Sequence, residues 1–330
     1  MISVAMAVYN GEKYIVEQLD SIRNQTRSVD EVIVCDDCSS DSTVEIINNY
    51  RKQYPSFPIL FFQNEKNLGY KLNFKEAMSK TSGDYIFLCD QDDVWFEDKV
   101  EQMVTKMKSN PKILVLASSF VYLDDTGRKY TVKQKRGMSN NNLYIRPVQY
   151  NDCKPIDFDL FLTRNFFQGS ALCITKKIKE EVVHHFSDKI HHDWFINITA
   201  SKYNGIYFWN KPFYAYRIHE SNAVGIQGEY ESKTDHIQKA NSLDVRTQLP
   251  KEGLKCLQAL QESDPIYYSK NIQRLDLLKQ FYLEHIHALE TNDTKAILME
   301  NRNAEYGLMK TKKARVMDVL FTLKGKLKRS

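Results

Sequence analysis

The sequence predicts an α/β protein: a mostly parallel central sheet flanked by helices, followed by a helical C-terminal region. Two observations carry this prediction. Short apolar runs alternate with segments of helical periodicity, and many of these runs are apolar throughout, as strands buried on both faces are. Residues 229–330 contain helical patterns without a convincing strand, which indicates a separate helical region.

In the first part of the chain, the residue pattern predicts alternating strands and helices. Apolar runs end at polar turns, and apolar side chains then recur at spacings of three and four. Ser39, Ser40 and Asp41 provide caps for the second helix. Such alternation implies right-handed crossovers, a parallel sheet and helices on both faces. The expected strands are 2–8, 31–35, 59–63 and 85–89. The expected helices are 12–25, 71–79 and 97–108, together with a helix around the apolar positions 44–47.

The next hundred or so residues predict a less regular pattern. Turn residues at 124–127 separate two strand-like runs, which is typical of a hairpin over 121–133. Residues 136–155 are rich in Asn, Pro and Gly and lack periodicity, so we expect a long loop over a site. The other expected elements are strands at 113–118, 170–175, 205–209 and 213–218, and helices at 176–186 and 192–203.

Composition limits the class of protein. The chain has 330 residues, enough for one large domain or a domain with an appendage, and no apolar stretch approaches the ~20 residues that span a bilayer. Met1 leads directly into an apolar run, so we expect no signal peptide and a cytoplasmic location. The six cysteines are scattered, as reduced thiols are, and the pair Cys35 and Cys38 lacks the second pair that a zinc site needs.

The positive charge of the chain is concentrated at its C-terminal end. Residues 310–330 contain eight Lys or Arg against Asp318 alone, a net charge of +7. Because the whole chain carries +4, the remainder carries −3. The basic end is therefore no indication of a nucleic-acid-binding body, and we expect no nucleic-acid partner.

An acidic stretch follows the expected strand 85–89. Asp90, Asp92 and Asp93 place three carboxylates within four residues, where an open parallel sheet binds its ligands. Clustered carboxylates repel one another, and a hard divalent cation relieves the repulsion while keeping positions open for phosphate oxygens. The alternative is a solvated acidic turn that caps the next helix. The adjacent buried strand and Trp95 favour a functional site.

Five motifs carry a resemblance to a known family. They are Ser3–Gly11 (SVAMAVYNG), Asp36–Thr43 (DDCSSDST), Asp90–Asp93 (DQDD), His191–Trp194 (HHDW) and Tyr216–Asn222 (YRIHESN). Over roughly residues 1–225 the sequence resembles the family-2 glycosyltransferases with the Rossmann-like GT-A fold, and it looks most like the bacterial rhamnosyltransferase-type members that build surface polysaccharides. Cys38 departs from the glycine that is usual in the family, which puts the local turn geometry in doubt. The implied domains are a catalytic domain at 1–228, with a nucleotide-sugar half at 1–118 and an acceptor half at 119–228, and the helical region at 229–330.

The resemblance also implies roles for individual residues. Asp193 would be the general base, and Asp92 with His219 would hold Mn²⁺ or Mg²⁺. The residues implied at the nucleotide are Ala7, Val8, Tyr9, Asn10, Asp37, Asn67, Lys71, Asp90 and Gln91. The residues implied at the sugar and acceptor are Trp95, Gln168, Gly169, Ser170, His192, Trp194 and Arg217, with Arg217 as a second positive contact to the diphosphate.

Several of these roles have structural alternatives. Asp37 would accept the N3–H of a uracil or thymine ring, or it caps the following helix. Asp193 is a base, a helix cap or both, and Asp93 is expected only to cap the next helix. His219 is a ligand or a surface histidine. Gly169 permits close approach of a sugar, or it begins a strand. Tyr9 flanks the base or packs at an edge.

The expected activity is transfer of a sugar, with inversion, from dTDP-rhamnose or a UDP-hexose to a hydroxyl of a growing, lipid-linked surface glycan. A nucleotidyltransferase of the same fold is the first alternative, but it would need a glycine-rich basic loop after the first strand, and residues 9–12 contain no basic residue. A non-catalytic sugar-nucleotide-binding module is the second alternative.

The C-terminal segment 306–330 predicts an amphipathic helix. Val316, Leu320, Leu323 and Leu327 recur at spacings of three and four, and Lys and Arg occupy much of the remaining circumference. This pattern favours a helix that lies on an anionic membrane surface and makes the protein peripherally membrane-associated. The alternative is a helix packed on the protein with a solvated basic face.

Overall fold

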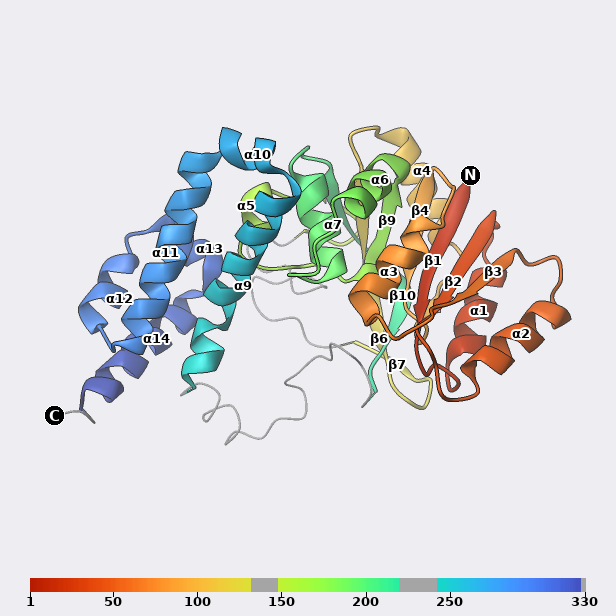
Figure 1. Cartoon of the computed structure of the whole chain (residues 1–330), viewed down its shortest axis with the longest axis horizontal. Coiled ribbons are helices and arrows are strands. Elements are labelled where there is room, and N and C mark those ends of the chain that lie inside the picture. The colour runs from red at the N-terminus through yellow and green to blue at the C-terminus, as the bar shows by residue number, and fades with distance from the viewer. Residues whose placement is uncertain (132–147, 220–241, 328–330) are drawn as a thin grey trace. The chain divides into compact units, whose positions relative to one another are not determined.

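The computed structural model describes residues 1–131, 148–219 and 242–327 (Figure 1). The chain divides into two compact units. Unit 1 comprises Met1–Phe158 with Asn165–Gly225, and unit 2 comprises Asp159–Arg164 with Ile226–Ser330. The expected boundary at 228/229 falls outside the described residues and stays a prediction.

Unit 1 is built on a ten-stranded sheet in the order β3-β2-β1-β4-β9-β6-β10-β5, with β7 paired to β6 and β8 paired to β10. The chain runs outward from β1 to β3 and then returns past β1 to β4, and these four strands are parallel. Right-handed crossovers therefore place α1 and α2 on one face of the sheet and α3 on the other. The bounds are β1 Ile2–Val8, β2 Glu31–Asp36, β3 Ile59–Gln63, β4 Tyr85–Cys89, α1 Ile15–Arg23, α2 Thr43–Gln53 and α3 Tyr70–Ser79.

The other side of the sheet is mixed. β9 runs antiparallel to both of its neighbours, β4 and β6, whereas β10 is parallel to β6. Helix α3 packs on α6 and α7. The bounds are β5 Val94–Trp95, α4 Lys99–Ser109, β6 Val115–Leu123, β7 Lys129–Tyr130, β8 Cys153–Pro155, α5 Phe158–Phe161, the 3₁₀ turn η2 Gly169–Ala171, β9 Leu172–Thr175, α6 Lys176–His184, α7 His192–Ser201 and β10 Ile206–Arg217.

The register of the parallel strands brings three polar loops together. Val8 at the end of β1 lies opposite Asp36, and Met6 lies opposite Cys89 at the end of β4. The side chains of β1, β2 and β4 are almost entirely buried, because helices cover both faces of the sheet. The loops after β1, β2 and β4 thus emerge together at the carboxyl ends of these strands, where the sequence places its acidic motifs.

The predicted fold class is confirmed, and several details differ. Residues 205–218, expected as two strands, contain the single strand β10, whose pairing with β6 shifts register around Pro212. Proline donates no hydrogen bond, so the strand stays extended while its ladder is interrupted. The expected loop 136–155 ends in β8, which pairs with β10, whereas 132–147 lie outside the described residues. The short strand β5 was not expected.

Unit 2 consists of helices together with the segment Asp159–Arg164, as the sequence predicted for its C-terminal region. The bounds are α9 Leu243–Ser263, α10 Pro265–Lys270, α11 Ile272–Glu290, α12 Thr294–Glu300, α13 Ala304–Met309 and α14 Lys312–Leu327. Of the helices described here, none has the length and hydropathy required to cross a bilayer. All six cysteines are free thiols, as expected.

Candidate active site

Side chains from neighbouring loops connect the ends of β1, β2 and β4. The Gln91 amide brackets Tyr9: its oxygen accepts from the Tyr9 N–H at 2.7 Å, and its nitrogen donates to the Tyr9 carbonyl at 2.9 Å. The Gly11 N–H donates to Thr43 Oγ1 at 2.7 Å. A Cβ at Gly11 would lie 2.6 Å from Gln91 Oε1, so a larger residue here would displace the Gln91 amide. Gln91 therefore shapes the loop that presents the exposed Tyr9 ring.

Asp37 organises the loop after β3 and does not cap α2. Its buried carboxylate accepts hydrogen bonds from the N–H groups of Leu68 and Gly69 and from Asn64 Nδ2, each at 2.8 Å. Asn67 donates to the Asp37 carbonyl at 3.0 Å. The capping alternative is thus wrong, because these bonds turn the carboxylate toward the 64–69 loop.

Cys38 occupies the tight turn after β2. Its φ is +64°, in the left-handed region that glycine enters without steric cost. The turn is held by Asp36, whose carboxylate accepts from the Ser39 N–H at 3.1 Å and also from the Ser39 hydroxyl. Cysteine therefore adopts a glycine-like backbone at the position where the family usually has glycine.

The acidic loop after β4 contains two buried carboxylates whose pKa values are raised. Burial, followed by the charge of Asp92, raises the pKa of Asp90 to about 7, although a hydrogen bond from Ser170 opposes this. The same two causes hold the pKa of Asp93 well above its usual range. Asp93 does not cap α4, whose N-cap is Asp98; instead its Oδ1 accepts from the Arg217 N–H at 3.0 Å.

Asp92 and His219 lie together, as the predicted metal site requires. Asp92 Oδ2 and His219 Nε2 are 2.9 Å apart, and the His219 ring lies 5.0 Å from that of Tyr14. Within the described ranges, no group of three or more His, Cys, Asp or Glu is placed to hold a metal ion. The pair fits a cation that takes its other ligands from substrate phosphates and water.

Arg217 has a different place from the one predicted. It is buried, and its guanidinium donates to the carbonyls of Asp92 at 2.7 Å and Asp124 at 3.3 Å and pairs with Glu17 at 2.5 Å. Through these contacts the Arg217 guanidinium holds the acidic loop in place. The predicted contact with sugar or diphosphate is not favoured by this placement.

Asp193 lies in the first turn of α7, one residue after the helix begins, whereas His191 takes the N-cap position. Burial raises its pKa to about 7, although hydrogen bonds from the Trp194 and Gly169 N–H groups and from Asn165 favour the charged form. The Trp194 bond is 2.7 Å long. A carboxyl group with this pKa can both take and release a proton near neutral pH.

His192 and Gly169 pack closely beside Asp193. The His192 ring stacks on Phe74 at 4.0 Å, and a Cβ added to Gly169 would lie 2.8 Å from His192 Nε2. The His192 ring is therefore the reason for glycine at position 169. The sequence had suggested two other reasons, close approach of a sugar and the start of a strand. Burial lowers the pKa of His192 to about 3, and neither ring nitrogen has a hydrogen-bond partner within the described part of the chain.

The remaining predicted residues are placed in different ways. Trp95 and Trp194 are buried, so neither offers an open ring face. Lys71 Nζ donates to the Asp188 carbonyl at 2.7 Å, and Asn10 joins its loop to Ser39 and Ser40. Ala7 and Val8 end β1, where the Val8 carbonyl accepts from the Asp37 N–H at 2.8 Å, and Gln168 immediately precedes the η2 turn.

Sequence reasoning missed Lys99. This first residue of α4 is fully buried, and Nζ donates to the Ser170 carbonyl at 2.8 Å. Burial lowers its pKa to about 8. A signal was present, because Lys99 precedes Met103 by four residues and Met107 by eight and so lies on the apolar stripe of its helix.

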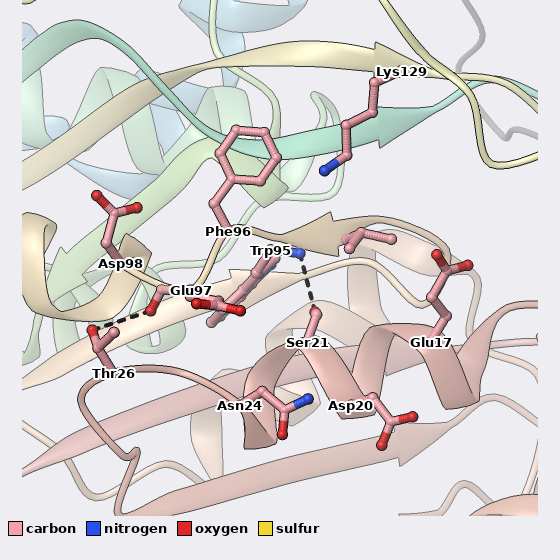
Figure 2. A pocket seen from close by; sticks show the side chains of 11 residues that line it. Glu17, Asp20, Ser21, Asn24, Thr26, Trp95, Phe96, Glu97, Asp98 and Lys129 are labelled. Carbon is pink, nitrogen blue, oxygen red and sulfur yellow. Dashed lines mark hydrogen bonds between the residues drawn. The ribbon is translucent and has the colours of Figure 1, made fainter.

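A separate hollow of about 630 Å³ lies between α1 and the β5 region (Figure 2). The backbone N–H of Trp95 donates to Ser21 Oγ at 3.0 Å, and Phe96 and Lys129 form part of the wall of the hollow. Trp95 is the one predicted site residue in its lining. The hollow is therefore distinct from the carboxylates at the strand ends.

Comparisons with known proteins agree with this arrangement. Residues 3–167, half of the chain, match the family described as Glycosyl transferase family 2. The chain is 29% identical to the dTDP-rhamnosyl transferase RfbG of Shigella flexneri over 240 residues, which cover 69% of this chain and 76% of that protein. It is 35% identical to the abequosyltransferase RfbV of Salmonella typhimurium over 115 residues, 38% of this chain and 34% of that protein.

The fold comparison extends over nearly the whole chain. The structure of S. aureus TarS 1–349 in complex with UDP-GlcNAc aligns with a TM-score of 0.58, covering 99% of this chain and 91% of that one. The sequence identity is 17%, so this likeness establishes the GT-A fold and no more.

Proposed function

The chain belongs to glycosyl transferase family 2 and is a glycosyltransferase, and we propose that it moves a sugar from a nucleotide diphosphate to an acceptor hydroxyl with inversion. The observation that carries the proposal is the placement of Asp193. Its buried carboxyl group has a pKa of about 7 and takes a hydrogen bond from the η2 turn. The same turn provides a hydrogen bond to Asp90 at the end of β4.

Asp193 acts as the general base. Its ionised carboxylate takes the proton of the acceptor hydroxyl while that oxygen attacks the anomeric carbon. The bond from this carbon to the diphosphate oxygen breaks on the opposite face, and the electron pair leaves with the diphosphate. Hydrogen bonds from Gly169 and Trp194 hold the carboxylate in place.

Asp92 and His219 are the residues that would hold a divalent cation, Mn²⁺ or Mg²⁺. When bound, the cation offsets negative charge on the leaving diphosphate. Arg217 fixes the loop that carries Asp92: its guanidinium donates to the Asp92 carbonyl, and its backbone N–H donates to the Asp93 carboxylate.

The donor is dTDP-rhamnose or a UDP-hexose, a proposal supported by the similarity to a dTDP-rhamnosyl transferase. Tyr9, which is 48% exposed, flanks the pyrimidine ring. A carboxylate has about four acceptor positions. Asp37 uses three of them for the 64–69 loop and accepts the ring N3–H with the fourth.

The acceptor is a lipid-linked glycan at an anionic membrane, reached through α14. The side chains of Val316, Leu320, Leu323 and Leu327 are 44–78% exposed along one face of this helix, while Asp318 on another face is buried. Basic residues flank the apolar stripe and would add about 1 kcal/mol each near anionic headgroups. This arrangement supports a helix that lies in a membrane interface.

Co-sedimentation with vesicles tests the membrane proposal. The double variant Leu320→Ser with Leu327→Ser is expected to lose binding to anionic vesicles at low salt, whereas Leu277→Ser, an equally exposed leucine of α11, is the matched control. Binding that is unchanged in the double variant, or insensitive to salt, would contradict the proposal.

Calorimetry with nucleotide diphosphates tests the catalytic proposal. TDP and UDP are titrated with and without Mn²⁺ into the wild type and Asp92→Ala, and the variant should lose the metal-dependent part of the affinity and its transfer activity. Synthesis of nucleotide sugar from sugar phosphate and nucleoside triphosphate would instead indicate the nucleotidyltransferase. Identical affinities in both proteins would remove the metal site from the proposal.

A further inference from the structure

The η2 turn, Gly169–Ala171, lies beside the three buried carboxylates whose pKa values are raised, Asp90, Asp93 and Asp193. The Gly169 N–H is among the donors that favour the charged form of Asp193, and the Ser170 hydroxyl, which has one proton to donate, favours the charged forms of Asp90 and Asp93. A movement of this three-residue turn would therefore displace the base and the acidic loop together. What holds the turn in place is thus relevant to the chemistry.

Lys99 is the cation beneath this turn. Its ammonium donates to the Ser170 carbonyl at 2.8 Å and lies 4.1 Å from the centroid of the Trp95 ring and 4.6 Å from that of Tyr214. The two aromatic faces and the carbonyl stabilise a fully buried positive charge. They also leave the ammonium little freedom to move, so the Ser170 carbonyl is held at a fixed point.

We propose that Lys99 is a positioning residue for transfer: by holding the Ser170 carbonyl, it keeps the Gly169 N–H on the Asp193 carboxylate and so keeps this base oriented toward the acceptor hydroxyl. The inference rests on the proposed function, in which Asp193 is the base. It assigns Lys99 no contact with substrate, and it places the effect of Lys99 on the proton-transfer step.

The titratable groups around Asp193 come from several elements. Tyr70 faces it from α3, Asp90 from the end of β4, and His191 and His192 precede it in α7. The Gly169 hydrogen bond favours the charged form of Asp193, so loss of this bond raises the pKa of the base. Because the base must be ionised to act, activity would then require a higher pH.

The experiment compares pH profiles of kcat for the wild type, Lys99→Met and Lys99→Gln. Met keeps the length of the side chain without a donor, and Gln keeps a donor without the charge. In Lys99→Met we expect kcat at pH 7 to fall roughly 10- to 100-fold, as small displacements of catalytic groups cause, and to recover partly by pH 9. We expect the donor KM of Lys99→Met to stay within about twofold of the wild-type value. The kcat of Lys99→Gln should lie between those of the wild type and Lys99→Met.

Lys106→Met is the matched control. Lys106 lies on the same helix and covers the Trp209 ring at 4.4 Å, but it has no contact with the turn. Its kcat profile should match that of the wild type. If Lys99→Met does not fold, as judged by circular dichroism, Lys99→Gln and the control decide the question alone.

The outcomes separate this inference from the proposed function. A loss of kcat that is equal at every pH, or a Lys99→Gln profile identical to the wild type, would overturn the positioning role while Asp193 remained the base. Near-normal turnover in Asp193→Asn would instead overturn the base itself, whatever Lys99 does.

Discussion

The buried carboxylate of Asp318 in unit 2 has different partners from three buried carboxylates of unit 1, those of Asp90, Asp93 and Asp193. In unit 2, Asp318 Oδ1 accepts from Arg246 at 2.5 Å, while Oδ2 accepts from Tyr306 at 2.7 Å and Lys310 at 2.8 Å. His285 joins this group through Lys310 and pairs with Glu300 at 2.6 Å. Each charge has an opposite charge or a hydrogen-bond donor close by, and the group holds α14 to α9, α11 and α13.

In unit 1, Asp90, Asp93 and Asp193 accept hydrogen bonds, but none of them is ion-paired with a Lys or Arg side chain in the described part of the chain. Among described residues, Asp93 Oδ2 has no hydrogen-bond partner, and burial raises the pKa values of all three groups. A fully partnered buried charge stabilises an arrangement of helices, whereas an incompletely partnered one costs stability and is available to react with a proton or a ligand. The contrast separates a structural cluster from the cluster that we propose to be catalytic.

The largest effect should follow from removing the base. Asp193→Asn keeps shape and hydrogen-bonding capacity but cannot take a proton, so we expect turnover to fall about 10²–10⁴-fold while donor binding persists. In the wild type, kcat should rise with pH around the Asp193 pKa of about 7. Steady-state kinetics and calorimetry measure both quantities, with the exposed Asp188 changed to Asn as a control. Near-normal transfer in Asp193→Asn would show that another group is the base.

Breaking the structural cluster should have the next largest effect. Asp318→Ala leaves Arg246 and Lys310 as buried cations without their carboxylate, so we expect it to destabilise unit 2 by about 3–5 kcal/mol. Urea unfolding followed by circular dichroism measures the loss. The exposed pair Lys251–Asp244 provides the control, since Asp244→Ala should change stability by less than about 1 kcal/mol. A similarly small effect at Asp318 would show that its buried ion pairs do not stabilise unit 2.

The same Asp193→Asn variant should gain stability, in contrast to Asp318→Ala. The pKa of Asp193 is raised from 3.8 to about 7 on folding, so the native state binds more protons than the unfolded state between these values. The stability of the wild type therefore falls as pH rises from about 4 to about 7. Asn cannot ionise, and we expect the variant to be about 1–3 kcal/mol more stable at pH 8 and similar to the wild type near pH 4. Thermal melts across this range test the difference.

The smallest effect concerns backbone rather than charge. Cys38 has a φ of +64°, which costs a non-glycine residue about 1–2 kcal/mol, while glycine increases the entropy of the unfolded chain. Cys38→Gly should therefore remain within about 1 kcal/mol of the wild type, and Cys38→Val should lose more because a β-branched side chain is poorly tolerated there. Denaturant midpoints measure both, and a large loss in the glycine variant would mean that the thiol contact with the Asn64 carbonyl is essential.

Local patterns predicted the strand ends well. The runs at Ile2–Val8 and Tyr85–Cys89 have the expected bounds, because a buried parallel strand is apolar throughout and its end is marked by polar turn residues. The departure at Cys38 also pointed to a real feature, since this turn adopts a glycine-like conformation. The acidic loop and the proposed base Asp193 were singled out from motifs with specific order and spacing.

Contacts between distant segments could not be predicted in the same way. Asp37 bonds a loop about thirty residues away, and Arg217 pairs with Glu17 from the other end of unit 1. Neither partner is marked by periodicity. The role of Lys99 depends on the position of η2, which sequence spacing does not define. The sequence thus indicated which residues gather at the strand ends, while the structure shows which of them are bonded to one another.

The segment Asp159–Arg164 has a consequence for genetic dissection of this protein. Phe161 and Leu162 are fully buried, and their carbonyls accept from Cys256 at 3.6 Å and Tyr282 at 3.0 Å, both in unit 2. A gene truncated after residue 225 would still encode this hexapeptide but not the helices that cover it. Exchange of C-terminal regions between related enzymes would therefore need three crossover points, one on each side of the hexapeptide and one after unit 1's second segment, or the hybrid chain would carry an apolar loop free to aggregate.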